Sequence, residues 1–177
     1  FKLQNVIAQI ITKVKSSYDY VVVDTSTNLN DINLALFDVA HKIVIVTTPS
    51  LPAVKNTKFV LDLFDKIGYE PDRTTILLNK VYTERERKAA TLATDRIQTF
   101  FRRPIAMEIP VVDERLIMAA ILKGVPITLA ERDRSKPPVK QLYDVAKLLS
   151  DALSGEGTPE AEKDKKPSGG GLFRRGG

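Results

Sequence analysis

The chain has 177 residues, of which 43% are hydrophobic, and a formal net charge of +5 at neutral pH. This is enough apolar material for one ordinary globular core. The sequence has no cysteine and a single histidine, His41, which excludes thiolate metal sites, disulfide frameworks and histidine-rich metal clusters. No apolar run is as long as a membrane span, and the modest positive charge does not by itself indicate a nucleic-acid partner.

Glycine is distributed unevenly along the chain. Seven of the nine glycines lie in residues 155–177, and the rest of the sequence holds only Gly68 and Gly124. A glycine-rich phosphate loop of the GxGxxG or GxxxxGK[ST] kind is therefore absent from these residues. Residues 155–177 are also rich in proline, glutamate and lysine, a composition typical of disorder. We predict one domain over residues 1–154 and a disordered tail over residues 155–177.

Predicted helices and strands alternate along the domain. Leu3 begins an amphipathic pattern that predicts a helix packed on a sheet. Uninterrupted apolar runs predict strands buried on both faces; these are residues 18–24, 43–46, 75–78 and 105–109. The apolar faces of the predicted helices span residues 3–14, 32–39, 54–67, 92–101, 116–121 and 142–153. The alternation predicts an α/β fold with a mostly parallel sheet and flanking helices.

Residue types that end helices occur at the expected places. Candidate N-cap residues are Asn30, Asp31, Ser50, Asp113 and Ser135. Gly68 and Gly124 stand where a glycine ends a helix.

Asp24 closes the first predicted strand and is followed by four small polar residues, Thr25 to Asn28. Ligands of open α/β sheets bind beyond the carboxyl ends of the strands. A carboxylate at that place suits Mg²⁺ or phosphate chemistry. Alternatively, Asp24 only caps a turn with Thr25 and Ser26. The stretch alone leaves both interpretations open.

Polar residues also close the next two predicted strands, at Thr47-Thr48 and Asn79-Lys80. An acid, a hydroxyl and a lysine at successive strand ends also describe a receiver domain that accepts a phosphoryl group. Three features count against that alternative. The helix between Thr48 and Lys80 is long for a receiver, no acidic pair for Mg²⁺ precedes Asp24, and a further strand and further helices follow Lys80.

Five segments, taken in order, resemble the MinD/ParA family of deviant P-loop ATPases. Residues 18–25 resemble the switch II segment, 44–50 the next strand and its turn, and 77–80 the strand that ends in the adenine-reading asparagine. Ile109-Pro110 with Asp113 resembles an Ile-Pro-x-Asp segment that packs along the adenine base in the family. Residues 120–126 resemble a helix end with the pattern Ala-(x)n-Gly-x-Pro. The resemblance covers about residues 3–153. Residues 49–53 and 58–64 are most similar to the TadZ/CpaE pilus-assembly branch.

The resemblance implies a role for each matching position. Asp24 would be the catalytic acid that orients water on Mg²⁺, and Thr25, Ser26, Thr27 and Asn28 would form switch II. The implied nucleotide-binding residues are Asn79, Lys80, Ile109, Pro110 and Asp113. The implied cofactors are ATP and Mg²⁺ in the full-length protein. An amide that donates and accepts, as in Asn79, suits the adenine edge.

The sequence also departs from the family pattern. Switch II of the family reads Asp-x-Pro-x-Gly, whereas Ser26 and Asn28 occupy the proline and glycine positions here. One extra residue separates Pro110 from Asp113. The family's phosphate loop and switch I would lie upstream of Phe1, so we expect this chain to be the second half of an ATPase domain.

The resemblance implies a cytoplasmic, ATP-binding homodimer that positions pilus or secretion machinery and is recruited to the inner face of the membrane or the cell pole. Slow or doubtful ATP hydrolysis is expected from the altered switch II. The alternative is a degenerate localisation scaffold that does not hydrolyse ATP.

Two further features are predicted to be solvated. Residues 172–175 place Leu and Phe beside two arginines, but four residues are too few for stable membrane binding. The other feature is a set of basic residues that would suit DNA, diluted by Glu84, Glu86 and Asp95. The set consists of Arg85, Arg87, Lys88, Arg96, Arg102 and Arg103. We expect neither membrane contact nor DNA binding from them.

Overall fold

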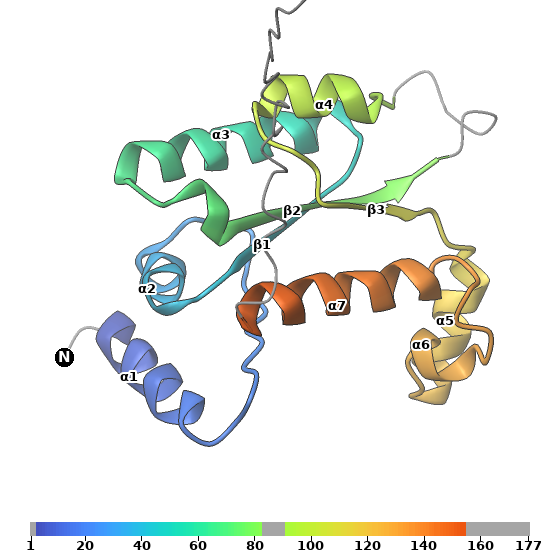
Figure 1. Ribbon diagram of the computed structural model, residues 1–177, viewed down its shortest axis with the longest axis horizontal. Coiled ribbons are helices and arrows are strands. Elements are labelled where there is room, and N and C mark those ends of the chain that lie inside the picture. The colour runs from blue at the N-terminus through green and yellow to red at the C-terminus, as the bar shows by residue number, and fades with distance from the viewer. Residues whose placement is uncertain (1–2, 83–90, 155–177) are drawn as a thin grey trace, which may run out of the picture.

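The computed structural model describes residues 3–82 and 91–154 (Figure 1). Its sheet has three parallel strands in the order β1 (Ile43–Thr47), β2 (Thr74–Val81) and β3 (Met107–Pro110). The helices are α1 (Leu3–Lys15), α2 (Asp31–Val39), α3 (Leu51–Ile67), α4 (Thr94–Phe101), α5 (Glu114–Lys123), α6 (Ile127–Ala130) and α7 (Val139–Ser154). A short 3₁₀ helix, Pro71–Arg73, precedes β2. The predicted α/β fold with a parallel sheet and flanking helices is confirmed.

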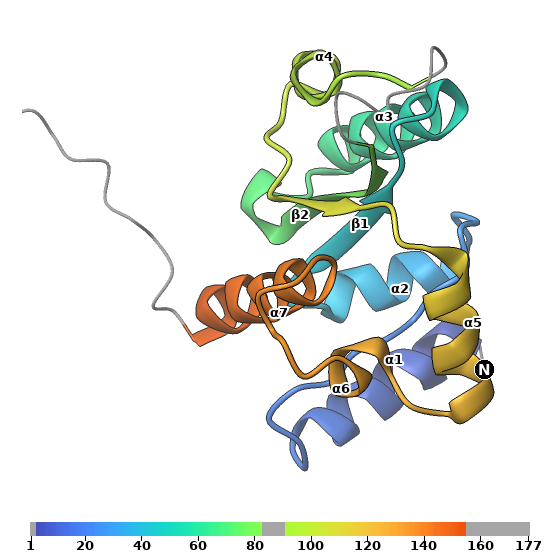
Figure 2. The same cartoon turned by 90° about the vertical axis from the view of Figure 1, so that its right-hand side faces the viewer.

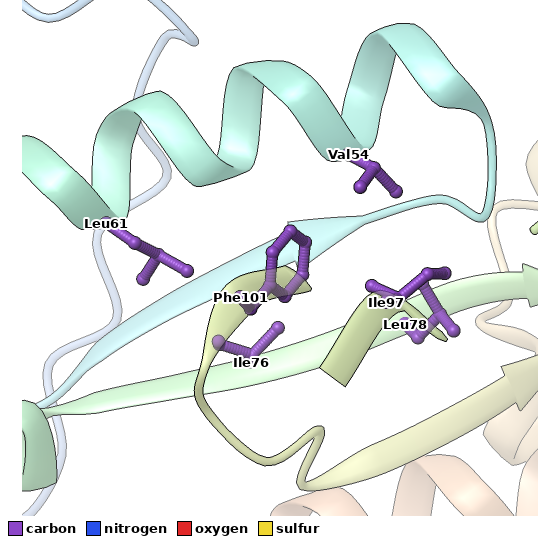
Figure 3. Close-up of a cluster of buried hydrophobic side chains, with 6 residues drawn as sticks. All are labelled: Val54, Leu61, Ile76, Leu78, Ile97 and Phe101. Carbon is purple, nitrogen blue, oxygen red and sulfur yellow. The ribbon is translucent and has the colours of Figure 1, made fainter. Parts of the chain in front are cut away.

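Helices cover both faces of the sheet. Figures 1 and 2 show α3 and α4 on one face and α2 and α7 on the other. The first face holds a core cluster, to which α3 contributes Val54 and Leu61, β2 contributes Ile76 and Leu78, and α4 contributes Ile97 and Phe101 (Figure 3). Each of these six side chains is at most 2% exposed. Because α3 and α4 both pack on β2, the carboxyl end of this strand is held in a fixed place.

The capping residues behave largely as predicted. The side chains of Asn30 and Asp113 accept hydrogen bonds at the starts of α2 and α5. Gly68 and Gly124 end α3 and α5 with φ of +81° and +62°, backbone that favours glycine. Ser50 precedes α3, but its hydroxyl faces that of Thr48 at 3.2 Å and makes no capping bond.

The predicted strand over residues 18–24 is wrong. Residues 18–24 pair with no strand in the described part of the chain, and Tyr18, Tyr20 and Val22 are 67%, 55% and 93% exposed. A strand is stabilised by backbone pairing and by packing of its side chains on neighbours. The apolar composition that suits a central strand is therefore present, but the neighbours that would make it one are not among the described residues.

Two predicted helices differ in detail from the structure. Helix α1 packs mainly against α2 and not on the sheet as predicted, so that its apolar face meets another helix. The final helix begins at Val139, and Ser135 is not its N-cap. The amide and hydroxyl of Ser135 instead donate to Asp133 at 2.9 and 2.6 Å. This local turn uses the hydroxyl that would have capped a helix.

The remaining differences are small. The strand predicted over residues 105–109 begins only at Met107, and the one-turn helix α6 was not predicted. The predicted tail lies outside the described residues, so its disorder stays a prediction.

Several apolar side chains are exposed at the edge of the sheet and on α5. Strand β1 is the edge strand on its side of the described sheet, and its Val44 and Val46 are 38% and 59% exposed. On α5, Ile121 and Leu122 are 65% and 81% exposed. Apolar surface of this kind is typical of regions that bind another protein segment.

Candidate functional site

The carboxyl ends of β2 and β3 bring together the polar and apolar residues that the sequence singled out. In the parallel register Asn79 lies beside Ile109, and Val81 lies beside Pro110. The backbone N–H of Val111 donates to the carbonyl of Val81 at 3.1 Å and extends the pairing past the end of β3. Asn79, Ile109 and Pro110 therefore share one edge of the sheet, where ligands of α/β folds bind.

The Asn79 side chain is oriented by its own backbone. Its Oδ1 atom accepts a hydrogen bond from the N–H of Lys80 at 2.9 Å. Within residues 3–82 and 91–154, its Nδ2 amino group makes no hydrogen bond. This half-buried amide can therefore donate to a ligand while its oxygen is already held.

Lys80 adopts an unusual backbone conformation at this edge. Its φ is +59°, and the register of β2 with β3 shifts between Asn79 and Val81. A left-handed conformation costs a non-glycine residue roughly 1–2 kcal/mol. Backbone strain of this kind concentrates at functional sites. Because of this irregularity, the exposed Lys80 does not follow the regular alternation of side chains between the two faces of the strand.

Asp113 is positioned by the start of α5 and by Arg115. One carboxylate oxygen accepts from the backbone N–H of Arg115 at 2.9 Å, and the other pairs with the Arg115 guanidinium at 2.6 Å. The guanidinium and amide bonds lower the pKa of Asp113 to about 2. Asp113 is therefore ionised, and its charge is already compensated. Arg115 was not among the predicted site residues, although it stands two positions after the predicted N-cap Asp113.

Asp24 is not held at a strand end in the way the sequence predicted. It lies in the segment before α2 that forms neither helix nor strand, and it is exposed, as is Thr25. Neither side chain makes a hydrogen bond within the described residues. Asp24 is accessible to a ligand, but the described structure does not place it beside Asn79.

The next residues of the predicted switch II are held by Asn33, which was not among the predicted site residues. Asn33 is only 4% exposed, and its Nδ2 donates to the carbonyl and hydroxyl oxygens of Ser26 and to the carbonyl of Asn28. The side chain of Thr27 is exposed. An asparagine between Ile32 and Leu34, in an otherwise apolar stretch of helix, is the signal that could have revealed it.

The threonines that close β1 have structural partners. Thr57 of α3 donates its hydroxyl proton to the hydroxyl of Thr47 at 2.9 Å, and both residues are buried. Thr48 faces Ser50, as described above. Thr47 therefore ties β1 to α3, and its hydroxyl is directed into the core.

The residues present fit part of a magnesium–nucleotide ligand. Asn79 and the apolar Ile109-Pro110 edge suit an adenine base, and one carboxylate, Asp24, suits a Mg²⁺ ion that takes its other oxygens from phosphates and water. No group of three metal-binding side chains occurs within the described ranges. Gly68 and Gly124 both end helices, so neither contributes to a phosphate cradle. The described residues do not fit the triphosphate.

Comparison with known proteins identifies the fold. The septum site-determining protein MinD of Thermotoga maritima is 25% identical over 150 residues, which cover 85% of this chain and 52% of that protein. A ParA family ATPase from Chlorobium tepidum superposes with a TM-score of 0.70 at 24% identity, over 82% of this chain and 57% of that one. The chain has the MinD/ParA-family P-loop ATPase fold.

Two further solved structures have the MinD/ParA fold. A chain of the MinC:MinD cell division protein complex of Aquifex aeolicus matches with a TM-score of 0.67 and 23% identity, over 86% of this chain and 59% of that one. MinD of Pyrococcus horikoshii, solved with Mg-ADP, matches with a TM-score of 0.66 and 16% identity, over 85% and 58%. No protein-family model matches the chain. The chain spans about half the length of the curated relative that it matches.

The predicted basic residues and the lengths of the helices bear on the partners of this MinD/ParA-like chain. Of the predicted basic set, Arg85, Arg87 and Lys88 lie outside the described residues. Arg103 pairs with Asp65, whereas Arg96 and Arg102 line a shallow groove between α3 and α4. No helix among the described residues is long and apolar enough to cross a membrane.

Proposed function

We propose that this chain is the base-binding part of a MinD/ParA-like ATP-binding protein that positions cellular machinery. The single observation that carries the proposal is the pairing of Asn79 with Ile109 at the carboxyl edge of a MinD/ParA-type sheet. Asn79 presents an amide donor that is unpaired within the described residues, beside the apolar edge of Ile109. Adenine offers a polar edge and an apolar face, and this combination recognises both.

The phosphate-binding loop is supplied by residues other than these 177. Two observations support this part of the proposal. The two glycines outside residues 155–177 both end helices, and the chain spans 52% of the Thermotoga maritima MinD. The unpaired apolar run over residues 18–24 and the exposed edge of β1 are surfaces that further strands of such a domain would cover. Residues 1–154 then form the second half of the domain.

In that complete domain, Asp24 would face the phosphates and orient the water of a bound Mg²⁺ ion. The chemistry of a carboxylate and its accessibility support this role. The Mg-ADP in the Pyrococcus horikoshii MinD structure supports the choice of ligand. Lys80 and Asp113 would border the base at the same edge as Asn79.

The machinery is pilus or secretion assembly of the TadZ/CpaE type. This part of the proposal rests on the wording of residues 49–53 and 58–64. The complex of MinC with MinD supports a partner-binding role for such a domain in general. A homodimer that forms in the cytoplasm and is recruited to the inner face of the membrane or to a cell pole fits the same function.

A non-hydrolytic scaffold is the second candidate, and one observation favours it. Ser26 and Asn28 replace the proline and glycine of switch II. In the scaffold, nucleotide binding would be weak or without turnover, and the surfaces alone would matter. A receiver-like phosphoacceptor is less consistent with the fold, because β3 and four helices, α4 to α7, follow Lys80.

The test is a measurement of ATP binding and turnover by the full-length protein, with and without Mg²⁺. Tight, Mg²⁺-dependent binding with slow turnover is the expected result. Binding without measurable turnover would favour the scaffold. If ATP at millimolar concentration does not bind, the base-binding role of this chain is wrong.

A further inference from the structure

Asn33 is a polar residue of α2 whose buried side chain forms hydrogen bonds with Ser26 and Asn28, in the segment that precedes the helix. Its Nδ2 lies 3.0 Å from the carbonyl oxygen and 3.2 Å from the hydroxyl oxygen of Ser26, and 2.6 Å from the carbonyl oxygen of Asn28. Its backbone N–H donates to the Oδ1 of Asn30 at 2.9 Å. One amide therefore holds both ends of the segment Ser26–Asn28 on the helix.

The helix that carries Asn33 is itself anchored to the sheet. Arg73, directly before β2, donates from Nη2 to the carbonyls of Phe37 and Ala40 at 2.7 Å each. The hydroxyl of Tyr69 donates to the carboxylate of Asp38. These contacts hold the C-terminal end of α2, while Asn33 acts near its N-terminal end. The segment Ser26–Asn28 is thus tied, through a fixed helix, to the start of β2.

The residues that Asn33 holds are those that depart from the family pattern. A proline ring restricts the backbone by itself, but serine and asparagine do not. Ser26 instead supplies two acceptors, its carbonyl and its hydroxyl, to a donor that is 4% exposed. Buried donors of this kind are costly to leave unpaired. The hydrogen bonds therefore restrict the segment in place of the ring.

We infer that Asn33 is a positioning residue, which holds Ser26–Asn28 on α2 and so fixes where Asp24, two residues upstream, is presented. The part that concerns Asp24 rests on the proposed function. Asn33 touches no reacting group, and its removal leaves Asp24 and Asn79 chemically unchanged. Loss of Asn33 is therefore expected to lower the rate of turnover without weakening adenine binding.

The positioning is tested first without nucleotide, in the full-length protein. A nitroxide spin label is attached at Thr27→Cys, because Thr27 is exposed and lies inside the held segment. Asn33→Leu, which keeps the volume and removes the donors, should make the label several-fold more mobile. Asn33→Ala is the second variant, in case the leucine is not accommodated. Asn56→Ala, an exposed asparagine of α3, is the matched control and should leave the label unchanged.

A double variant makes the test sharper. Ser26→Pro introduces the ring that the family pattern has at this position. Combined with Asn33→Leu, it should restore most of the immobilisation of the label, because the ring restricts the segment without the amide. A label that stays as mobile in the double variant as in Asn33→Leu would overturn the idea that the hydrogen bonds replace the ring.

The kinetic readout separates this inference from the proposed function. For Asn33→Leu we expect kcat for ATP to fall about tenfold while KM is unchanged. Unchanged label mobility in both Asn33 variants overturns the inference, whatever the ATP results. Increased mobility in a protein that binds no ATP supports the positioning role and refutes the proposed function. Increased mobility with unchanged kcat overturns the link to Asp24.

Discussion

The side-chain oxygen of Asn79 accepts a hydrogen bond from the backbone N–H of Lys80 at 2.9 Å. The contact links two features of the candidate site. Asn79 offers its amino group to a ligand, and Lys80 has a left-handed backbone conformation. Because the oxygen is held, the amino group has a defined direction at the edge shared with Ile109. The geometry of the candidate base site is thus set within two consecutive residues of β2.

Replacing Asn79 by alanine should weaken adenine nucleotide binding by the full-length protein about tenfold, the value of one hydrogen bond that would be left unmade. The fold should survive, because the side chain lies at a strand end outside the core cluster. Isothermal titration with ATP measures the effect. Asn56→Ala, on the exposed face of α3, is the control. Equal affinities for wild type and Asn79→Ala would rule out base recognition by Asn79.

Replacing Asp24 by alanine should lower Mg²⁺-dependent turnover by about 100-fold or more, while ATP still binds. The carboxylate is exposed and unpaired within the described residues, so its loss removes no packing. Asp19→Ala changes an exposed acid in the same segment between α1 and α2 and should have no effect on turnover. Undiminished kcat in Asp24→Ala would remove this residue from the mechanism.

Lys80→Gly and Arg102→Gly should each stabilise the protein by about 1 kcal/mol. Both residues have a positive φ, of 59° and 56°, and the relief of roughly 1–2 kcal/mol exceeds the entropic cost of glycine in the unfolded chain. Denaturant unfolding measures both changes. Only Lys80→Gly should also weaken ATP binding, because Arg102 ends α4 away from the candidate site. If Arg102→Gly is stabilising and Lys80→Gly is not, the strain assigned to Lys80 is absent.

Tyr69 should make stability depend on alkaline pH. Burial, followed by the hydrogen bond to Asp38, raises the pKa of Tyr69 from 10.0 to about 12. The folded state thus binds this proton more tightly than the unfolded state. The stabilisation is complete below pH 10 and is lost as the pH rises from 10 to about 12.

The measurement is the difference in free energy of unfolding between wild type and Tyr69→Phe across this pH range. The difference should shrink as the pH rises. In Asp38→Asn, which removes the hydrogen-bonding carboxylate and so lowers the folded-state pKa of Tyr69, the decline should be smaller and end at a lower pH. A difference that stays constant up to pH 12 would show that the Tyr69 proton is not bound more tightly in the folded state.

The predictions from sequence succeeded where local patterns decide the structure. The apolar runs at 43–46 and 75–78 form β1 and β2, and Gly68 and Gly124 end their helices. Asn30 and Asp113 cap α2 and α5 as expected. In each case the stabilising contact lies within a few residues along the chain, so the sequence contains all the information needed. The register that puts Asn79 beside Ile109 could not be read in this way, although the alternation of elements implied that their strand ends are close.

Residues 18–24 and Asn33 show what only the tertiary structure decided. The first is an apolar run that has every local property of a central strand. It is nevertheless largely exposed and pairs with no strand among the described residues, because a strand forms only where a neighbouring strand pairs with it. The second is a polar residue whose purpose depends on acceptors five and seven positions earlier in a folded turn. By itself, the sequence determined the α/β alternation, the helix ends and the residue types at the strand ends. Which of those residues meet, and which run lacks a partner, depended on pairing and packing between distant segments, because those contacts exist only in the folded chain.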